Sequence, residues 1–126
     1  MNRQRPFKGV IPEGSMWTLL LPLLVPWGIA AGQPIHDHCA QAIPVELDTP
    51  FMGSSAGATG TMLSGCSVND RFDVWHVFTP HNTGYHRISL CGSDFDTTLA
   101  VYDGCGGTRL ACNDDVCWLQ SEVIAY

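Results

Sequence analysis

The chain has 126 residues, of which 12 are acidic and 6 are basic, and its net charge is −6 at pH 7 with neutral histidines. This length fits one small domain, and the acidic balance argues against nucleic acid or an anionic membrane as a partner, because lysine and arginine carry the affinity for phosphate groups. Calcium or a cationic partner suits such a chain better.

Residues 1–32 have the pattern of a secretory signal peptide. The segment begins with three basic residues, Arg3, Arg5 and Lys8. An almost wholly apolar stretch follows over residues 16–27, and small residues come after it. This order is typical of a signal helix that is cleaved during export. We therefore predict a secreted protein, extracellular or periplasmic, whose mature domain is residues 33–126.

Two alternatives to a cleaved signal stay open. The apolar stretch is shorter than the roughly 20 residues that cross a bilayer, so we expect no stable membrane span, and an uncleaved anchor is the alternative. Met16 is a second possible start of translation. After cleavage three arginines would face 11 carboxylates, which gives the mature domain a net charge of −8.

The first part of the mature domain predicts an edge strand and then an irregular region. Residues 42–47 form the strand, and Pro44 places it at a sheet edge because proline cannot donate to a central ladder. Glycine, serine, alanine and threonine dominate residues 50–65, a composition typical of loops.

The strongest strand signal covers residues 73–79. Apolar side chains occupy both alternating sets of positions, which predicts a strand that is buried on both faces. Residues 80–84 have the composition of a turn, and residues 85–91 predict a second strand.

Three more short strands are predicted over residues 97–102, 108–112 and 122–126. In the first of them Thr97, Leu99 and Val101 share one face. Turns rich in glycine, aspartate and asparagine separate these strands, and no window after the signal has a sustained helical period. The fold class is therefore all-β, an antiparallel β-sandwich. Because the last strand ends with the sequence, we expect an incomplete sandwich.

All six cysteines follow the predicted signal: Cys39, Cys66, Cys91, Cys105, Cys112 and Cys117. An even number in an exported chain predicts disulfides, which help a small domain with a modest core. Six cysteines allow fifteen pairings. We expect Cys105 to pair with Cys112 across a hairpin, Cys91 with Cys117, and Cys39 with Cys66.

Four strand motifs occur in order between Asp37 and Tyr126. They are Asp73-Val-Trp-His-Val-Phe-Thr, Gly84-Tyr-His-Arg-Ile-Ser-Leu, Phe95-Asp-Thr-Thr-Leu-Ala-Val-Tyr-Asp and Leu110-Ala-Cys-Asn-Asp-Asp. This series resembles the bacterial pre-peptidase C-terminal (PPC) domain. The resemblance implies a jelly-roll-like β-sandwich without catalytic activity, appended to secreted proteases and surface proteins. Such domains are cleaved off during maturation or bind insoluble targets such as collagen, and some bind calcium.

The chain departs from the PPC pattern in two ways. It lacks the further strands that the family has after the position of Tyr126, and it carries no peptidase domain before the module. We therefore expect a truncated form of the domain, in which part of a target-binding face is absent.

Six oxygen-bearing residues cluster at predicted strand ends: Asp94, Asp96, Asp103, Asn113, Asp114 and Asp115. Calcium takes six to eight oxygen ligands from flexible loops, so this set is a candidate calcium site. Aspartate and asparagine also cap turns, and that structural role is the competing interpretation. The spacing of an EF-hand is absent.

Three further patterns have weaker claims to a function. His36-Asp-His-Cys39 with Cys66 offers zinc ligands, although a disulfide competes for both cysteines. Gly53-Ser-Ser-Ala-Gly57 matches a nucleophile elbow around Ser55 but lies in a glycine-rich loop region of a short β-chain. Among the aromatic residues, Trp75 is expected in the core and Trp118 at the surface.

These observations predict a non-catalytic, secreted accessory or binding module. We expect it to be a monomer that binds or shields an extracellular protein or cell-surface material, and we expect no required cofactor other than possible calcium. A calcium-stabilised structural domain is the first alternative. A secreted hydrolase that uses Ser55 and a histidine is the second.

Overall fold

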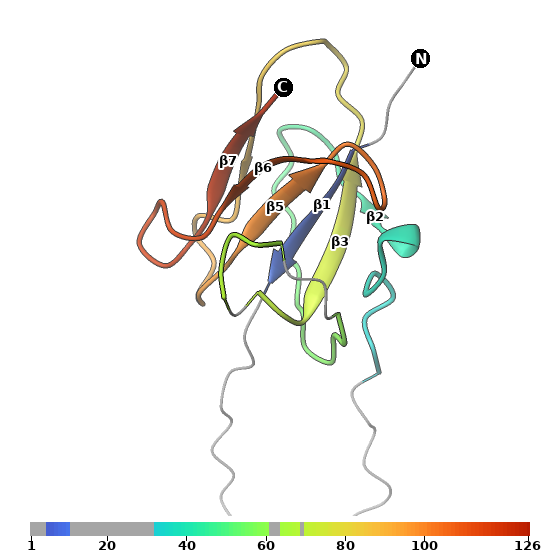
Figure 1. Cartoon of the computed structure of the whole chain (residues 1–126), viewed down its shortest axis with the longest axis vertical. Helices are drawn as coiled ribbons and strands as arrows, with labels where there is room; N and C mark the ends of the chain where they lie inside the picture. The colour runs from blue at the N-terminus through green and yellow to red at the C-terminus, as the bar shows by residue number, and fades with distance from the viewer. Residues whose placement is uncertain (1–4, 11–31, 61–63, 69) are drawn as a thin grey trace, which may run out of the picture.

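The computed structural model describes residues 5–10, 32–60, 64–68 and 70–126 (Figure 1). Its elements are β1 (Arg5–Val10), a short 3-10 turn (Cys39–Gln41), β2 (Ile43–Pro44), β3 (Asp73–Phe78), β4 (His86–Ser89), β5 (Leu99–Tyr102), β6 (Arg109–Asn113) and β7 (Glu122–Ala125). Among the described residues no helix is long and apolar enough to cross a membrane. The predicted all-β class is confirmed.

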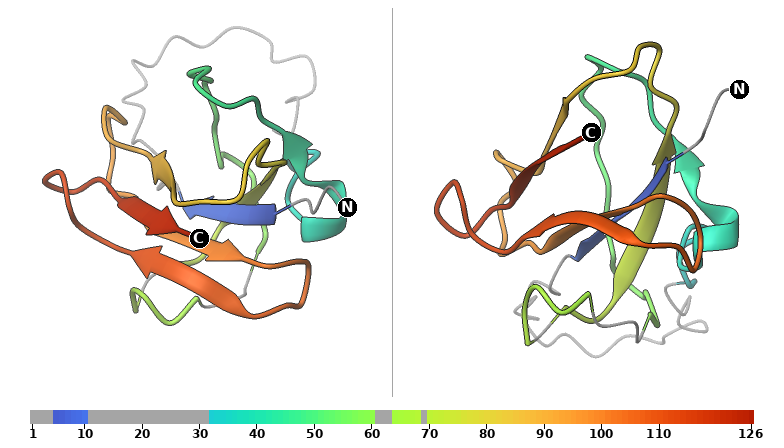
Figure 2. Two further views of the ribbon diagram at one scale, coloured as in Figure 1. Left: turned by 90° about the horizontal axis from the view of Figure 1, so that it is seen from above. Right: turned by 45° about the horizontal axis from the view of Figure 1, so that its top comes forward.

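The strands form two sheets. One has the order β2-β3-β1-β5-β6, and the other consists of β4 and β7. Figure 2 shows the two-stranded sheet beside the five-stranded one from two further directions. Every pair is antiparallel except β2 with β3, which is parallel.

The positions of most strands agree with the sequence. The strands from β3 to β7 lie where five strands are predicted, with ends shifted by one or two residues. β2 is shorter than predicted, but it occupies the sheet edge that Pro44 requires. Its short length is explained by proline, which removes a backbone donor from the ladder.

The N-terminal segment differs from the expected signal helix where the structure describes it. Arg5 and Lys8 belong to β1, an extended strand that lies between β3 and β5. Backbone pairing with two neighbouring strands is the reason for the extended conformation. The apolar stretch over residues 16–27 lies outside the described residues.

The core consists of two clusters on opposite faces of the larger sheet. The first lies between the sheets and contains Phe78, Leu99, Val101, Val123 and Ala125. On the other face of the larger sheet lies a second cluster: Trp75, Ala100 and Tyr102, with Cys39, Ala42, Cys66 and Cys112 packed against it. The burial of β3 on both faces and the core position of the tryptophan on this strand are therefore confirmed.

Three disulfides connect all six cysteines: Cys39 with Cys105, Cys66 with Cys112, and Cys91 with Cys117. The Cα atoms of the pairs are 5.6, 6.0 and 5.9 Å apart, within the normal range for a disulfide. The third pairing was expected, and the other two expectations are wrong.

The hairpin register explains the error. In the β5–β6 pair Cys112 lies opposite Ala100, whereas Cys105 lies in the turn between the strands, so these cysteines do not face each other. Each of them instead binds a cysteine from the segment before β3. Two disulfides thus attach this segment to the β5–β6 hairpin.

We expect peptide mapping of the non-reduced protein to recover these three pairs. Replacement of both Cys66 and Cys112 by serine should lower the free energy of unfolding by about 4 kcal/mol in the loop-closure model, because their sequence separation is 46. Denaturant titration measures the change. A cross-linked peptide joining Cys105 to Cys112 would contradict the hairpin register.

Candidate functional site

Among the residues whose burial the structure describes, the most exposed aromatic residue lies in the loop between β6 and β7. Trp118 is 93% exposed, and its neighbours Val116 and Leu119 are also exposed. Residues 116–120, here called the tryptophan turn, therefore present an apolar surface to solvent. An exposed aromatic side chain flanked by exposed apolar residues is a candidate contact for a partner.

The tryptophan turn is held in one conformation by covalent and hydrogen bonds. Cys117 is bonded to Cys91, and the backbone N–H groups of Val116 and Cys117 both donate to the carbonyl oxygen of Gln120, at 2.9 and 3.0 Å. Trp118 has a φ of 71°, in the left-handed region that costs a non-glycine residue about 1 kcal/mol or more. The turn therefore holds the backbone of Trp118 in a strained conformation and presents its side chain to solvent.

A buried polar network joins the tryptophan turn to the start of β5. The N–H of Thr97 donates to the carbonyl oxygen of Leu119 at 2.9 Å, and the N–H of Ser121 donates to the Thr97 hydroxyl at 2.9 Å. The Ser121 hydroxyl also bonds to the carbonyl oxygens of Thr97 and Asp114. Because Thr97 and Ser121 are almost fully buried, this network attaches the turn firmly to the sandwich.

Three of the six predicted calcium ligands lie together beside the tryptophan turn. Partial burial and the nearby carboxylates of Asp115 and Asp114 raise the pKa of Asp96. The Thr98 hydroxyl donates to Asp114 Oδ1 at 2.6 Å. These three aspartates, here called the acidic cluster, form a locally negative surface.

The other predicted ligands are not brought into this cluster by any contact that the structure shows. Asp103 Oδ1 accepts the N–H of Thr108 at 2.7 Å, which is the turn-capping role that competed with calcium binding. Asp94 is exposed, and Asn113 Oδ1 is buried without a hydrogen-bond partner among the described residues. Within the described part of the chain, no three His, Cys, Asp or Glu side chains are arranged to hold a metal ion.

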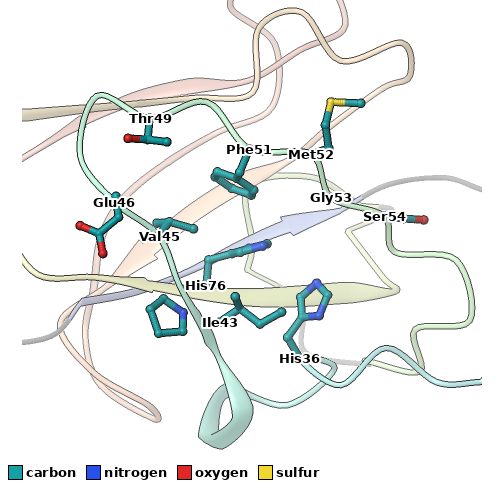
Figure 3. A pocket seen from close by; sticks show the side chains of 11 residues that line it. His36, Ile43, Val45, Glu46, Thr49, Phe51, Met52, Gly53, Ser54 and His76 are labelled. Carbon is teal, nitrogen blue, oxygen red and sulfur yellow. The ribbon is translucent and has the colours of Figure 1, made fainter.

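A separate pocket of about 650 Å³ lies beside β2 and β3 (Figure 3). The Phe51 and His76 rings are 4.7 Å apart between centroids, and the His36 and His76 rings are 5.0 Å apart. Burial lowers the pKa of His76 to about 4, with a smaller contribution from His36, and burial also lowers the pKa of His36. The pocket is thus lined by neutral rings at physiological pH.

The pocket was not predicted from the sequence. Phe51 and Met52 interrupt a region of small residues, and two apolar side chains at that place were the available signal. His76 is only 6% exposed. Both ring nitrogens of His36, which lines the pocket, are buried without a hydrogen-bond partner among the described residues.

The zinc and nucleophile patterns do not assemble as their chemistry requires. Cys39 and Cys66 are both in disulfides, so neither offers a thiolate to zinc. Ser55 is 1% exposed and lies in a loop, without the strand-to-helix turn that presents a nucleophile in an elbow.

We expect acid to destabilise the fold between pH 6.5 and 4. An unfolded histidine has a pKa near 6.5, whereas His76 in the folded state has a pKa of about 4, so the unfolded state binds more protons in this window. The contribution of His76 is complete above pH 6.5 and decreases as the pH falls to about 4. Its loss should be on the order of 1–3 kcal/mol.

Denaturant titration from pH 7 to pH 4 measures this slope in wild type, in His76→Gln and in His81→Gln as the exposed-histidine control. The slope should be smaller only in His76→Gln. Parallel curves for all three proteins would contradict the role of His76.

The comparisons with known proteins identify a family. Residues 35–123 match a family model described as "Galactose binding domain-like", which is associated with the type IX secretion system. No curated protein and no solved structure matched the chain. The resemblance to the PPC domain is not confirmed beyond a β-sandwich of a related kind, because the matching model belongs to another family. Since the match covers most of the sequence and the structure is a disulfide-linked all-β domain, the chain belongs to the galactose-binding-domain-like family.

Proposed function

We propose that this chain is a non-catalytic extracellular module that binds cell-surface material or an extracellular protein through the tryptophan turn. The observation that carries the proposal is the 93% exposure of Trp118 on a turn held by a disulfide and a buried polar network. Export is supported by the three disulfides and by the secretion association of the family.

The physical advantage of this turn is preorganisation. A turn whose backbone is already ordered loses little backbone freedom when a ligand packs on it, so more of the contact energy appears as affinity. Tryptophan is among the residues that dominate binding energy at interfaces. Val116 and Leu119 extend the apolar contact around the indole ring.

The acidic cluster adds a second chemical preference. Carboxylates accept hydrogen bonds from hydroxyl groups and attract cations, while the indole face takes a flat apolar surface. A sugar ring offers an apolar face and hydroxyl donors together. The family description names galactose binding, so we propose galactose-containing polysaccharide as the first ligand class to test, with collagen-type protein as the second.

The test is a binding assay with insoluble galactan and with collagen, followed by calorimetry on soluble fragments. Trp118→Ala should weaken binding at least about tenfold, because an aromatic anchor contributes on the order of 1–3 kcal/mol. Met52→Ala is the matched control, since Met52 is fully exposed but lies at the separate pocket.

The two variants distinguish the two surfaces. Loss of binding in Met52→Ala, with full binding in Trp118→Ala, would move the site to the pocket and contradict the role of the tryptophan turn. Absence of binding to both ligand classes by the wild-type protein would contradict the proposed function.

We propose calcium as a second ligand, bound at the acidic cluster after its side chains rearrange, because the described residues hold no preformed group of three metal ligands. The supporting observation is the raised pKa of Asp96, because the neighbouring carboxylates that cause it repel one another and a divalent cation would relieve that repulsion. Calcium would then stabilise the base of the tryptophan turn through Asp114, whose carbonyl oxygen bonds to Ser121.

We expect millimolar calcium to raise the melting temperature by several degrees relative to a chelator control, because a ligand of the native state stabilises it. Asp115→Asn should abolish the rise, whereas Glu46→Gln, an exposed carboxylate outside the cluster, should preserve it. Equal melting temperatures with calcium and with chelator would show that no site exists.

A further inference from the structure

The centre of the larger sheet depends on a segment that is also the basic end of the predicted export signal. β1 pairs with β3 along its whole length and with β5 at Phe7, Lys8 and Gly9. β3 and β5 are therefore not neighbours, and Figure 1 shows β1 running between them. Removal of residues 1–32 would remove the strand that joins the two halves of the sheet.

Most positions on both sides of β1 are apolar and buried, and the exceptions are two buried polar residues, His76 opposite Phe7 and Asp73 opposite Val10. Lys8 is at the register position between Trp75 and Ala100, and Gly9 is between Val74 and Leu99. These four neighbours are at most 3% exposed. A strand between two such strands is best matched by apolar residues on both faces.

The residue types of β1 fit this environment poorly. A lysine stands at the position between two buried apolar residues, Pro6 has no N–H to donate to β3, and Gly9 has no side chain to pack. Proline and glycine are both unfavourable inside a central strand. β1 therefore occupies the position without the side chains that would hold it best.

The position would not close by itself when β1 is removed. Adjacent strands lie about 4.8 Å apart, so β3 and β5 on either side of a missing strand are about 10 Å apart and cannot bond to each other directly. Their facing N–H and C=O groups would lose their partners, and buried backbone groups without partners are costly.

We infer that, after export removes residues 1–32, the slot between β3 and β5 binds an extended apolar segment of another protein, antiparallel to both strands. The inference rests on the export that the proposed function assumes. Addition of a strand to open sheet edges is a known mode of peptide recognition, in which the backbone gives affinity and the side chains give specificity.

Two observations define the partner segment. Its side chains must be mainly apolar on both faces, because Trp75 and Ala100 lie on one side of the sheet and Leu99 and Val101 lie on the other, where His76 is a buried polar neighbour. Its flanks are basic, because the mature domain has 11 carboxylates and three arginines. The described strands of a second copy are already paired in its own sheets, so they are not available to fill the slot.

The test uses the full chain with a site for a specific protease inserted after Gly32, which is exposed. The folded, oxidised protein is cleaved and then incubated with labelled peptides of residues 5–10. One peptide has the natural sequence, one carries Lys8→Val and one carries Lys8→Pro. Native mass spectrometry and fluorescence polarisation follow exchange of the N-terminal fragment for the peptide.

We expect the Lys8→Val peptide to displace the fragment and to bind about tenfold more tightly than the natural peptide, because valine suits a strand buried on both faces. The Lys8→Pro peptide should bind about tenfold more weakly or not at all, because proline removes a ladder donor. Unfolding of the cleaved protein without peptide, with refolding when the Lys8→Val peptide is added, would equally support the slot.

Three results would overturn the inference. In the first, the N-terminal fragment leaves and the cleaved domain keeps its melting temperature without binding any peptide. In the second, the cleaved domain unfolds and no peptide restores its fold; in the third, the three peptides bind equally tightly. Binding of galactan or collagen is measured on the same samples. If galactan or collagen binding depends on Trp118 but no peptide binds between β3 and β5, only this inference is wrong. If galactan and collagen bind to none of the samples, the proposed function is wrong independently.

Discussion

The fold depends on the complete burial of β5. Leu99 and Val101 point into the cluster between the sheets, and Ala100 and Tyr102 point into the cluster on the opposite face. One four-residue strand thus contributes to both cores, and its backbone also joins β6 to the rest of the larger sheet. This arrangement stabilises a small domain with two small hydrophobic clusters, because alternate residues of one buried strand pack into opposite clusters. The disulfides then stabilise the face that has no second sheet to cover it.

The sequence predicts the parts of the fold that follow from alternation within one segment. The two-faced burial of β3 and the shared face of Leu99 and Val101 are local patterns, and both are confirmed. The disulfide pairing could not be obtained in this way, because it depends on how the β5–β6 register places Cys112 opposite Ala100. Such long-range geometry has no signature in cysteine spacing.

The candidate site was predictable to a similar extent. The exposure of Trp118 follows from its place in a polar turn next to a cysteine, and the structure agrees. The grouping of Asp96 with Asp115, and the separate capping role of Asp103, required the hairpin geometry. The pocket at His76 could not be predicted from the sequence, because the loop residues that line it come together through tertiary contacts and have no periodic sequence pattern. The strand role of Arg5 was hidden by its fit to an export signal.

The bond between Cys91 and Cys117 also has a mechanical meaning. In the proposed function, a ligand held by Trp118 would pull on a residue next to this covalent link, and the link leads directly to the segment that follows β4. Tension from an anchored surface would therefore pass into the smaller sheet through sulfur rather than through the weak hydrogen bonds of the loop.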